Sequence, residues 1–248
     1  TKGSRVIAGD GRLVLKLYYT ANTNTVYKVE HHLEQPDGTY TLKETENKSG
    51  MTGATATAVS NTYAGYTYDS TVSGTITSGV IAGDGRLVLK LYYTANTDTA
   101  YKVEHYLEQP DGSYLLKDTD DLTGITGSSV TATANVYAGY TVNLFHVNTV
   151  LSGNINGYGS LTLKLYYEAN INTAYKVEHY LEQPDGSYVL EDTDNLTGTT
   201  GASVTAITRT YEGYTFDNTI SGTIESGNIL GDGSLVLKLY YTANTDTQ

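Results

Sequence analysis

The sequence of 248 residues has no cysteine, no tryptophan, one methionine, two phenylalanines and three prolines. Without cysteine, the chain can form neither a disulfide framework nor a cysteine-based metal site. No apolar run approaches the roughly 20 residues of a membrane-spanning helix, so membrane insertion is not expected. Only 15 lysines and arginines stand against 27 aspartates and glutamates, which gives a net charge of −12. This acidity argues against nucleic acid as a partner, because its phosphates would be repelled.

What the chain does contain is a repeat of 74 residues. The run Leu-x-Leu-Lys-Leu-Tyr-Tyr begins at Leu13, Leu87, Leu161 and Leu235. The period divides the chain into the C-terminal part of a preceding repeat and three complete repeats, which are residues 1–26, 27–100, 101–174 and 175–248. Residue 1 aligns with Thr75, so we expect the chain to be an excerpt of a longer array. An array reuses one module and an enzyme builds one unique pocket, so we do not expect an enzyme or a cofactor.

Repeat 2 serves to predict the secondary structure. Residues 101–108 alternate apolar and polar side chains, as a half-buried strand does. Pro110 and Gly112 predict a tight turn, after which 113–119 returns as the second strand of a hairpin. Further strands are expected at 129–134, 137–142 and 161–167, and a short, stiff connector at 168–174. No stretch has helical periodicity, so the sequence predicts a mainly β fold of tandem modules.

Repeat 2 departs from the period between two of its strands. Ser152-Gly153 lies 79 residues after Ser73-Gly74, and the loop that follows is shorter by the same five residues. The extra residues include Leu144, Phe145, His146 and Val147. One interpretation is a contact site around Phe145 that is particular to this repeat. The other is drift in a loop whose apolar residues pack against the same core.

The order of short motifs resembles a known family. Pro110-Asp111-Gly112 is followed by Thr123-Gly124-x-x-Gly127, Gly139-Tyr140, Ser152-Gly153 and the closing Leu-x-Leu-Lys-Leu-Tyr-Tyr. This order resembles the mucin-binding-protein (MucBP-like) repeats of Gram-positive surface adhesins and is similar to Listeria–Bacteroides repeats of cell-wall proteins.

The resemblance implies small β-grasp-like (ubiquitin-like) modules arranged as beads on a string, with the first and last strands parallel at the centre of the sheet. It implies a secreted, cell-wall-associated protein of a Gram-positive bacterium. Its repeats would either bind host mucin, other glycans or matrix, or space a distal binding domain. The family has no shared catalytic residues, so none is expected here.

Histidine and the acidic clusters are the candidates for metal binding. His31, His105 and His179 fall on the apolar side of the first strand of each repeat, where a hydrogen-bonded core histidine is favoured over a metal ligand or proton switch. Clusters such as Asp118-Thr119-Asp120-Asp121 could offer oxygens to calcium, but no EF-hand spacing accompanies them, so solvated strand ends are favoured.

Tyrosine, with 24 copies, is the most abundant aromatic residue. On the predicted strands several tyrosines face away from the core side, and neighbouring first and last strands would place them in pairs. Amphipathic rings of this kind suit sugar stacking or a partner surface, although they also suit a covered second sheet face. The candidate contact residues are Tyr92, Tyr106, Tyr166, Tyr180, Tyr240 and Phe145.

Two further features concern covalent and intermolecular links. Lys102 or Lys164, assisted by Glu104, could form an isopeptide bond with a linker asparagine, but a solvated charge pair is favoured. The apolar segment Leu13–Tyr19 lacks the preceding strands of its own repeat and would pair with repeat 1, pair with another chain by self-association, or remain disordered.

Three function classes compete for such a sequence. An extended stalk of a surface adhesin or fibre is favoured, multivalent binding of mucin or host glycans ranks close behind it, and an enzyme ranks far behind. The acidity of the chain gives no long-range attraction to acidic mucins, which shifts weight towards the stalk.

Overall fold

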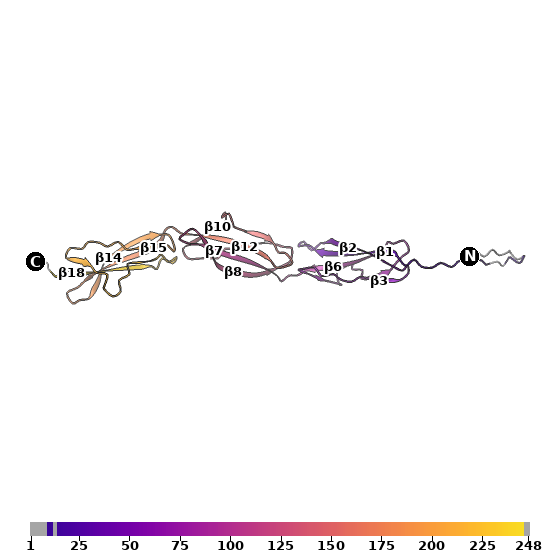
Figure 1. The fold of residues 1–248 in the computed structure, drawn as a ribbon, viewed down its shortest axis with the longest axis horizontal. Coiled ribbons are helices and arrows are strands. Elements are labelled where there is room, and N and C mark those ends of the chain that lie inside the picture. The colour runs from indigo at the N-terminus through magenta and orange to yellow at the C-terminus, as the bar shows by residue number, and fades with distance from the viewer. Residues whose placement is uncertain (1–8, 12–13, 246–248) are drawn as a thin grey trace. The chain divides into compact units, whose positions relative to one another are not determined.

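The computed structural model describes residues 9–11 and 14–245, which form strands and turns without any helix. No helix that could cross a bilayer is therefore found in this part of the chain. The chain divides into two compact units, Thr1–Ala95 and Asn96–Gln248. The first unit contains the six strands β1–β6, and the second contains two sets of six, β7–β12 and β13–β18 (Figure 1).

The first unit builds one four-stranded sheet and one small ribbon. Its strands are β1 (Thr25–Glu34), β2 (Tyr40–Gly50), β3 (Thr55–Thr57), β4 (Tyr66–Tyr68), β5 (Ser78–Val80) and β6 (Val88–Ala95). The sheet has the order β2-β1-β6-β4, and β3 pairs with β5. The central pair β1–β6 is parallel, whereas β2 and β4 are antiparallel to their neighbours.

The second unit repeats this topology twice. Repeat 2 contains β7 (Thr99–Glu108), β8 (Tyr114–Gly124), β9 (Ser129–Thr131), β10 (Tyr140–Asn143), β11 (Ser152–Asn154) and β12 (Leu161–Ala169). Repeat 3 contains β13 (Thr173–Glu182), β14 (Tyr188–Gly198), β15 (Ser203–Thr205), β16 (Tyr214–Phe216), β17 (Ser226–Asn228) and β18 (Val236–Ala243). The sheet orders are β10-β12-β7-β8 and β14-β13-β18-β16, again with a parallel central pair.

The hairpin turns follow directly from their sequence. In the β1–β2 turn, Gly38 has a φ of 79°, which an L side chain rarely adopts. The Asp37 carboxylate accepts hydrogen bonds from the backbone N–H and the hydroxyl of Thr39 at 2.9 and 2.6 Å, and these bonds lower the pKa of Asp37. Such a self-bonded turn fixes the register of the hairpin.

Each sheet buries one face in a small core. In the first unit Leu89, Leu91 and Tyr93 of β6 are almost wholly inaccessible, because β6 is a central strand. The β3–β5 ribbon and its flanks close this face with Ala56 and Ile81. The equivalent strands β12 and β18 form the centre of the two cores in the second unit.

The predicted mainly β fold of repeated modules is confirmed, and the arrangement is compatible with a β-grasp-like class. The hairpin and the parallel central strands are found as expected. The short strand β11 was not predicted. The central strands are longer than expected, so only residues 170–172 separate β12 from β13.

Of the three outcomes considered for the segment Leu13–Tyr19, pairing with repeat 1 is not found among the residues that the structure describes. Leu13 lies outside the described residues, and residues 14–19 form no strand and are exposed, with Tyr18 at 88% and Tyr19 at 87%. In each repeat the equivalent segment is held by a neighbour on either side. Residues 14–19 have no such neighbours among the residues described, so the apolar pattern alone does not make a strand.

Candidate functional site

The face of each sheet opposite the core carries a cluster of aromatic rings, which we call the aromatic face. Its members are His32, Tyr40 and Tyr92 in repeat 1, Tyr106, Tyr114 and Tyr166 in repeat 2, and Tyr180, Tyr188 and Tyr240 in repeat 3. The parallel register sets Tyr106 beside Tyr166 and Tyr180 beside Tyr240. Their rings stack with centroids 4.9 Å apart in both repeats.

The structure therefore brings together the tyrosines that the sequence placed on this face. In repeat 1 the ring stacked on Tyr92 is that of His32, which occupies the position equivalent to Tyr106 and lies 5.0 Å away. A third ring from the second strand meets each stack edge-on, as Tyr114 does with Tyr166 at 5.2 Å.

Charged groups border the aromatic face. In repeat 2 the Tyr106 hydroxyl donates to Glu104 at 2.6 Å, and the Lys164 ammonium lies 3.4 Å from the same carboxylate. In repeat 3 the hydrogen bond to Glu178, with some help from burial, raises the pKa of Tyr180 to about 12. These hydroxyls are therefore neutral donors at physiological pH and are already committed to a carboxylate.

The extra residues of repeat 2 change its aromatic face. His146 stacks on Tyr166 with centroids 4.1 Å apart and also contacts Tyr114 at 4.7 Å. Tyr166 is consequently 7% exposed, with Tyr106 and His146 both stacked on its ring. A sugar could stack on Tyr166 only if one of these rings moved.

Phe145 has the opposite environment, since 96% of it is exposed. Its backbone N–H donates to the Asn143 side chain at 2.9 Å, which ties the loop to the end of β10. Val147 is 88% exposed and Leu144 is 45% exposed. The apolar residues of this loop do not pack into the core, so the interpretation of a drifted loop tucked against that core is wrong.

A second cluster lies on the core side of each sheet, around a buried histidine. His31, His105 and His179 are inaccessible to solvent, and their Nδ1 atoms lie 2.8, 2.8 and 2.9 Å from the hydroxyls of Tyr93, Tyr167 and Tyr241. The expectation of a hydrogen-bonded core histidine is confirmed. Each hydroxyl also accepts a backbone N–H, from Asn61, Asn135 or Arg209, at 2.9 Å. In repeats 2 and 3 a carboxylate faces Nε2, so the tautomer with its proton on Nε2 and the tyrosine hydroxyl donating to Nδ1 satisfies both ring nitrogens.

The partner of Nε2 differs between the repeats. It meets Asp120 at 3.2 Å in repeat 2 and Asp194 at 3.1 Å in repeat 3. In repeat 1 the equivalent residue is Glu46, whose nearest carboxylate oxygen is 3.9 Å away, and His31 Nε2 has no hydrogen-bond partner. Burial lowers the pKa of His31, with Glu46 and Glu44 opposing the shift.

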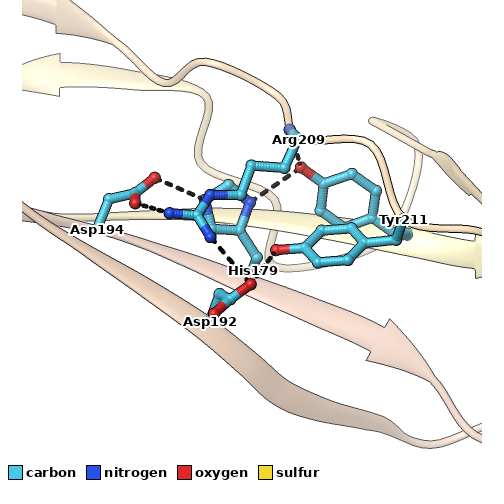
Figure 2. Close-up of polar contacts among 6 residues, drawn as sticks. His179, Asp192, Asp194, Arg209 and Tyr211 are labelled. Atoms are coloured by element: carbon cyan, nitrogen blue, oxygen red, sulfur yellow. Dashed lines mark hydrogen bonds and ion pairs between the residues drawn. The ribbon is translucent and has the colours of Figure 1, made fainter.

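Repeat 3 adds an arginine to this cluster, as Figure 2 shows. Arg209 pairs with both Asp192, at 2.9 Å, and Asp194, while Tyr211 donates to Asp192 at 2.9 Å. The hydrogen bond from His179, reinforced by Arg209, lowers the pKa of Asp194. Repeats 1 and 2 have Asn61 and Asn135 where repeat 3 has Arg209.

The acidic clusters considered for calcium therefore have other partners. Besides binding histidine, their carboxylates accept hydroxyl protons from the core side, as Glu44 does from Tyr63 at 2.8 Å. Among the residues that the structure describes, no group of three or more histidine, aspartate or glutamate side chains is arranged to hold a metal ion. Lys102 and Lys164, considered for a crosslink, pair with Asp121 and Glu104.

Sequence reasoning missed the histidine–carboxylate pairing. Asp120 lies 15 residues from His105, and a bulge between His105 and Tyr106 shifts the hairpin register. The signal available was the alternation itself, which puts Asp118 and Asp120 on the same side of the hairpin as His105.

The arginine of repeat 3 offers a prediction with an internal control. Arg209→Asn gives repeat 3 the residue that repeat 2 has naturally, and it removes two ion pairs. Because the Arg209 side chain is 42% exposed, we expect the free energy of unfolding of repeat 3 to fall by less than about 1 kcal/mol. Hydrogen-exchange mass spectrometry of the full chain, with peptides from β13 and β18, would measure the change. In 1 M salt the difference should shrink; a loss that is unaffected by salt would show that packing is responsible.

Acid should weaken repeat 1 through His31. The folded-state pKa of His31 lies below the ordinary value of about 6.5, so the unfolded state binds the proton more tightly. The stability that depends on the neutral ring is complete above about pH 6.5 and is lost as the pH falls below it. We expect hydrogen exchange in β1 and β6, corrected for intrinsic rates, to accelerate between pH 7.5 and 5.5. The variant His31→Gln should lose this dependence; its persistence would assign the effect to other groups.

Comparisons with known proteins place the chain beside surface repeats. No protein-family model matches it, and no curated protein does. Among solved structures it is similar to "Streptococcal High Identity Repeats in Tandem (SHIRT) domains 3-4 from cell surface protein", at 18% identity over 58% of this chain and 98% of that chain, with a TM-score of 0.20. It is also similar to "Crystal structure of Mub-RV", at 12% identity over 59% and 99%, TM-score 0.20. A third is "Type 2 repeat of the mucus binding protein MUB from Lactobacillus reuteri", at 13% identity over 58% and 100%, TM-score 0.19. The solved structures to which the chain is similar thus include cell-surface and mucus-binding repeats.

Proposed function

We propose that this chain is the repeat region of a bacterial cell-surface protein and acts as an extended spacer. The observation that carries the proposal is the parallel pairing of the first and last strands in every repeat. Parallel neighbours start at one end of a sheet and finish at the other. The chain therefore enters each repeat at one end and leaves it at the opposite end.

The strand length sets how far each repeat carries the chain. β1 has ten residues, and β6 ends beyond the level of Leu33, which pairs with Tyr93. At about 3.3 Å per residue, one repeat advances the chain by roughly 33 Å. An antiparallel pair of terminal strands would return the chain to its starting end and advance it by almost nothing.

The exit of each repeat is fastened to its entry strand. The carboxylate of Glu34 accepts the N–H of Ala95 at 2.8 Å, and Glu108 and Glu182 do the same for Ala169 and Ala243 at 2.9 Å. Each glutamate stands at the end of the first strand of its repeat. The last strand is thereby held to its final residue, and little free chain is left to bend.

A spacer of this kind needs no pocket, metal or nucleophile, which accords with a role as a non-enzymatic module outside the cell. We place it on the outside of a Gram-positive bacterium, in association with the cell wall, as the resemblance of its motifs implies.

The spacer predicts the size of the chain in solution. Three repeats in line would span about 100 Å, which gives a radius of gyration of at least about 29 Å. A compact protein of this length would have a radius of about 18 Å. Small-angle X-ray scattering of the full chain would distinguish the two, and a value near that of the compact protein would refute the spacer.

A second candidate function is multivalent binding of mucin or other host glycans. The exposed Phe145 of repeat 2, beside the aromatic face, is the observation that favours it. Because Tyr166 is covered in repeat 2, the remaining candidate rings are Tyr92, Tyr106, Tyr180 and Tyr240. The aromatic face recurs in all three repeats, so weak sites on it would gain from repetition along the array.

This candidate predicts retention on immobilised mucin or a glycan array, and its loss in Phe145→Ser. We expect at least a tenfold loss of retention if Phe145 is a principal contact. The matched control is Val136→Thr, which alters an equally exposed residue to the one that repeats 1 and 3 carry at this position. If the unaltered chain is not retained at all, binding is refuted and the spacer alone stands.

A further inference from the structure

Within the second unit, the end of repeat 2 meets repeat 3 backbone against backbone. Gly139 precedes β10, and Gly231 lies between β17 and β18. A Cβ on Gly231 would lie 1.9 Å from the carbonyl oxygen of Ala138, and a Cβ on Gly139 would lie 2.5 Å from the Cα of Gly231. Gly139 has a φ of 78°, but Gly231 is not among the glycines with a positive φ. The glycine at 231 is therefore explained by close approach to repeat 2 rather than by its own conformation.

Hydrogen bonds also join repeat 2 to repeat 3 at this position. The carbonyl oxygen of Gly139 accepts two of them, from the N–H of Asn170 at 2.8 Å and from the hydroxyl of Thr200 at 2.9 Å. The N–H of Thr200 donates in turn to the carbonyl oxygen of Asn170 at 2.9 Å. Asn170 belongs to the connector, so connector, repeat 2 and repeat 3 are joined in one closed set of bonds.

Thr200 is 3% exposed, and its hydroxyl also lies 2.6 Å from the hydroxyl of Thr173. Because Thr200 gives its proton to Gly139, it accepts the proton of Thr173. Both hydroxyls are thus satisfied in a buried position, where an unsatisfied one would cost about 1–3 kcal/mol. The buried Thr200 hydroxyl thus links a bond within repeat 3 to a bond with repeat 2.

A second point of contact limits rotation. Gly201, with a φ of 80°, lies against Pro110, since a Cβ added there would meet the Pro110 ring at 3.5 Å. Pro110 is part of the β7–β8 turn, which is distant in sequence from Gly139. Two separate points on repeat 2 thus hold neighbouring residues of repeat 3, and one flexible hinge cannot satisfy both.

We propose that this contact is a specific interface whose partner is the next copy of the same repeat, and that it fixes the orientation of repeat 3 on repeat 2. The proposal rests on the spacer function and deepens it, since a fixed orientation makes a spacer stiff. Every repeat carries both halves of the interface. One half consists of the glycine before the fourth strand and the proline of the hairpin turn. These residues are Gly65 and Pro36 in repeat 1, Gly139 and Pro110 in repeat 2, and Gly213 and Pro184 in repeat 3. The other half consists of the Thr-Gly turn and the glycine between the fifth and sixth strands. These residues are Thr52-Gly53 and Gly83 in repeat 1, Thr126-Gly127 and Gly157 in repeat 2, and Thr200-Gly201 and Gly231 in repeat 3.

The exit end of repeat 3 is built as that of repeat 2 is. The N–H of Asn244 donates to Gly213 at 2.8 Å, as Asn170 does to Gly139. The Thr215 hydroxyl donates to the Asn244 side chain at 2.6 Å, and Thr141 donates to Asn170 at 2.7 Å. A hollow of about 660 Å³, lined by residues that include Thr215, Asn244 and Thr245, opens at this end of repeat 3. The exit ends of repeats 2 and 3 thus share the same hydrogen-bond arrangement.

The test uses the full chain and its lack of cysteine. Lys117→Cys and Glu191→Cys place spin labels on exposed, equivalent positions of repeats 2 and 3. Double electron–electron resonance then measures the distribution of distances between the two labels. We expect one narrow distribution, and Gly231→Ala should at least double its width or shift its mean. The control is Gly83→Ala, the equivalent change in repeat 1, where an added Cβ meets only the Thr52 side chain at an ordinary 3.6 Å. This control should leave the distribution unchanged.

An unchanged distance distribution in the variant Gly231→Ala would contradict the proposed interface. Should hydrogen exchange show that this variant unfolds repeat 3, Thr200→Val decides the matter instead, because it removes the bond to Gly139 and keeps the shape of the side chain. A narrow, unshifted distribution in Thr200→Val would then overturn the proposal. The two proposals can fail separately. A large radius of gyration together with a broad distance distribution would support a spacer but contradict a fixed orientation between repeats 2 and 3.

Discussion

The parallel pairing of the first and last strands is the constraint on which the rest of each repeat depends. It makes both strands central, so each supplies one side to the core and the other to the aromatic face. It brings His105 within reach of Tyr167 across 62 residues of sequence, and Tyr106 beside Tyr166. It also sets the direction in which the chain leaves the repeat. The core, the aromatic stack and the path of the chain therefore share one origin.

The three repeats show how much can vary around this pair. The backbone topology is the same in all three, yet the buried histidine faces a distant glutamate in repeat 1, an aspartate in repeat 2, and an aspartate held by Arg209 in repeat 3. The aromatic face likewise exchanges a tyrosine for His32 in repeat 1 and gains His146 in repeat 2. Such changes lie beside the central pair and leave its hydrogen bonds intact, so the scaffold tolerates them.

Much of the fold could be predicted because its signals are local. Alternation placed the strands, Pro110 and Gly112 placed the hairpin turn, and the two strand faces predicted the tyrosine pairs. The carboxylates that bind the buried histidines could not be assigned, because a bulge in the hairpin sets their register. The sequence left alternatives open for the loop around Phe145 and for residues 14–19, since the choice between them depends on neighbours that a local pattern does not contain. The role of Gly231 could not be predicted either, because only the approach of another repeat explains it.

The last strand of each repeat lies parallel to the first strand and is held to it by a glutamate, which has a mechanical consequence. Tension applied along the chain pulls on Thr25 and Ala95, which are at opposite ends of two parallel strands. The six ladder positions from Lys28–Val88 to Leu33–Tyr93 are then loaded in shear, all together, instead of being peeled apart one after another. Rupture must break them at once, and the rate of forced unfolding is governed by that barrier rather than by equilibrium stability. A repeat of modest thermodynamic stability can for this reason resist a pull along the chain.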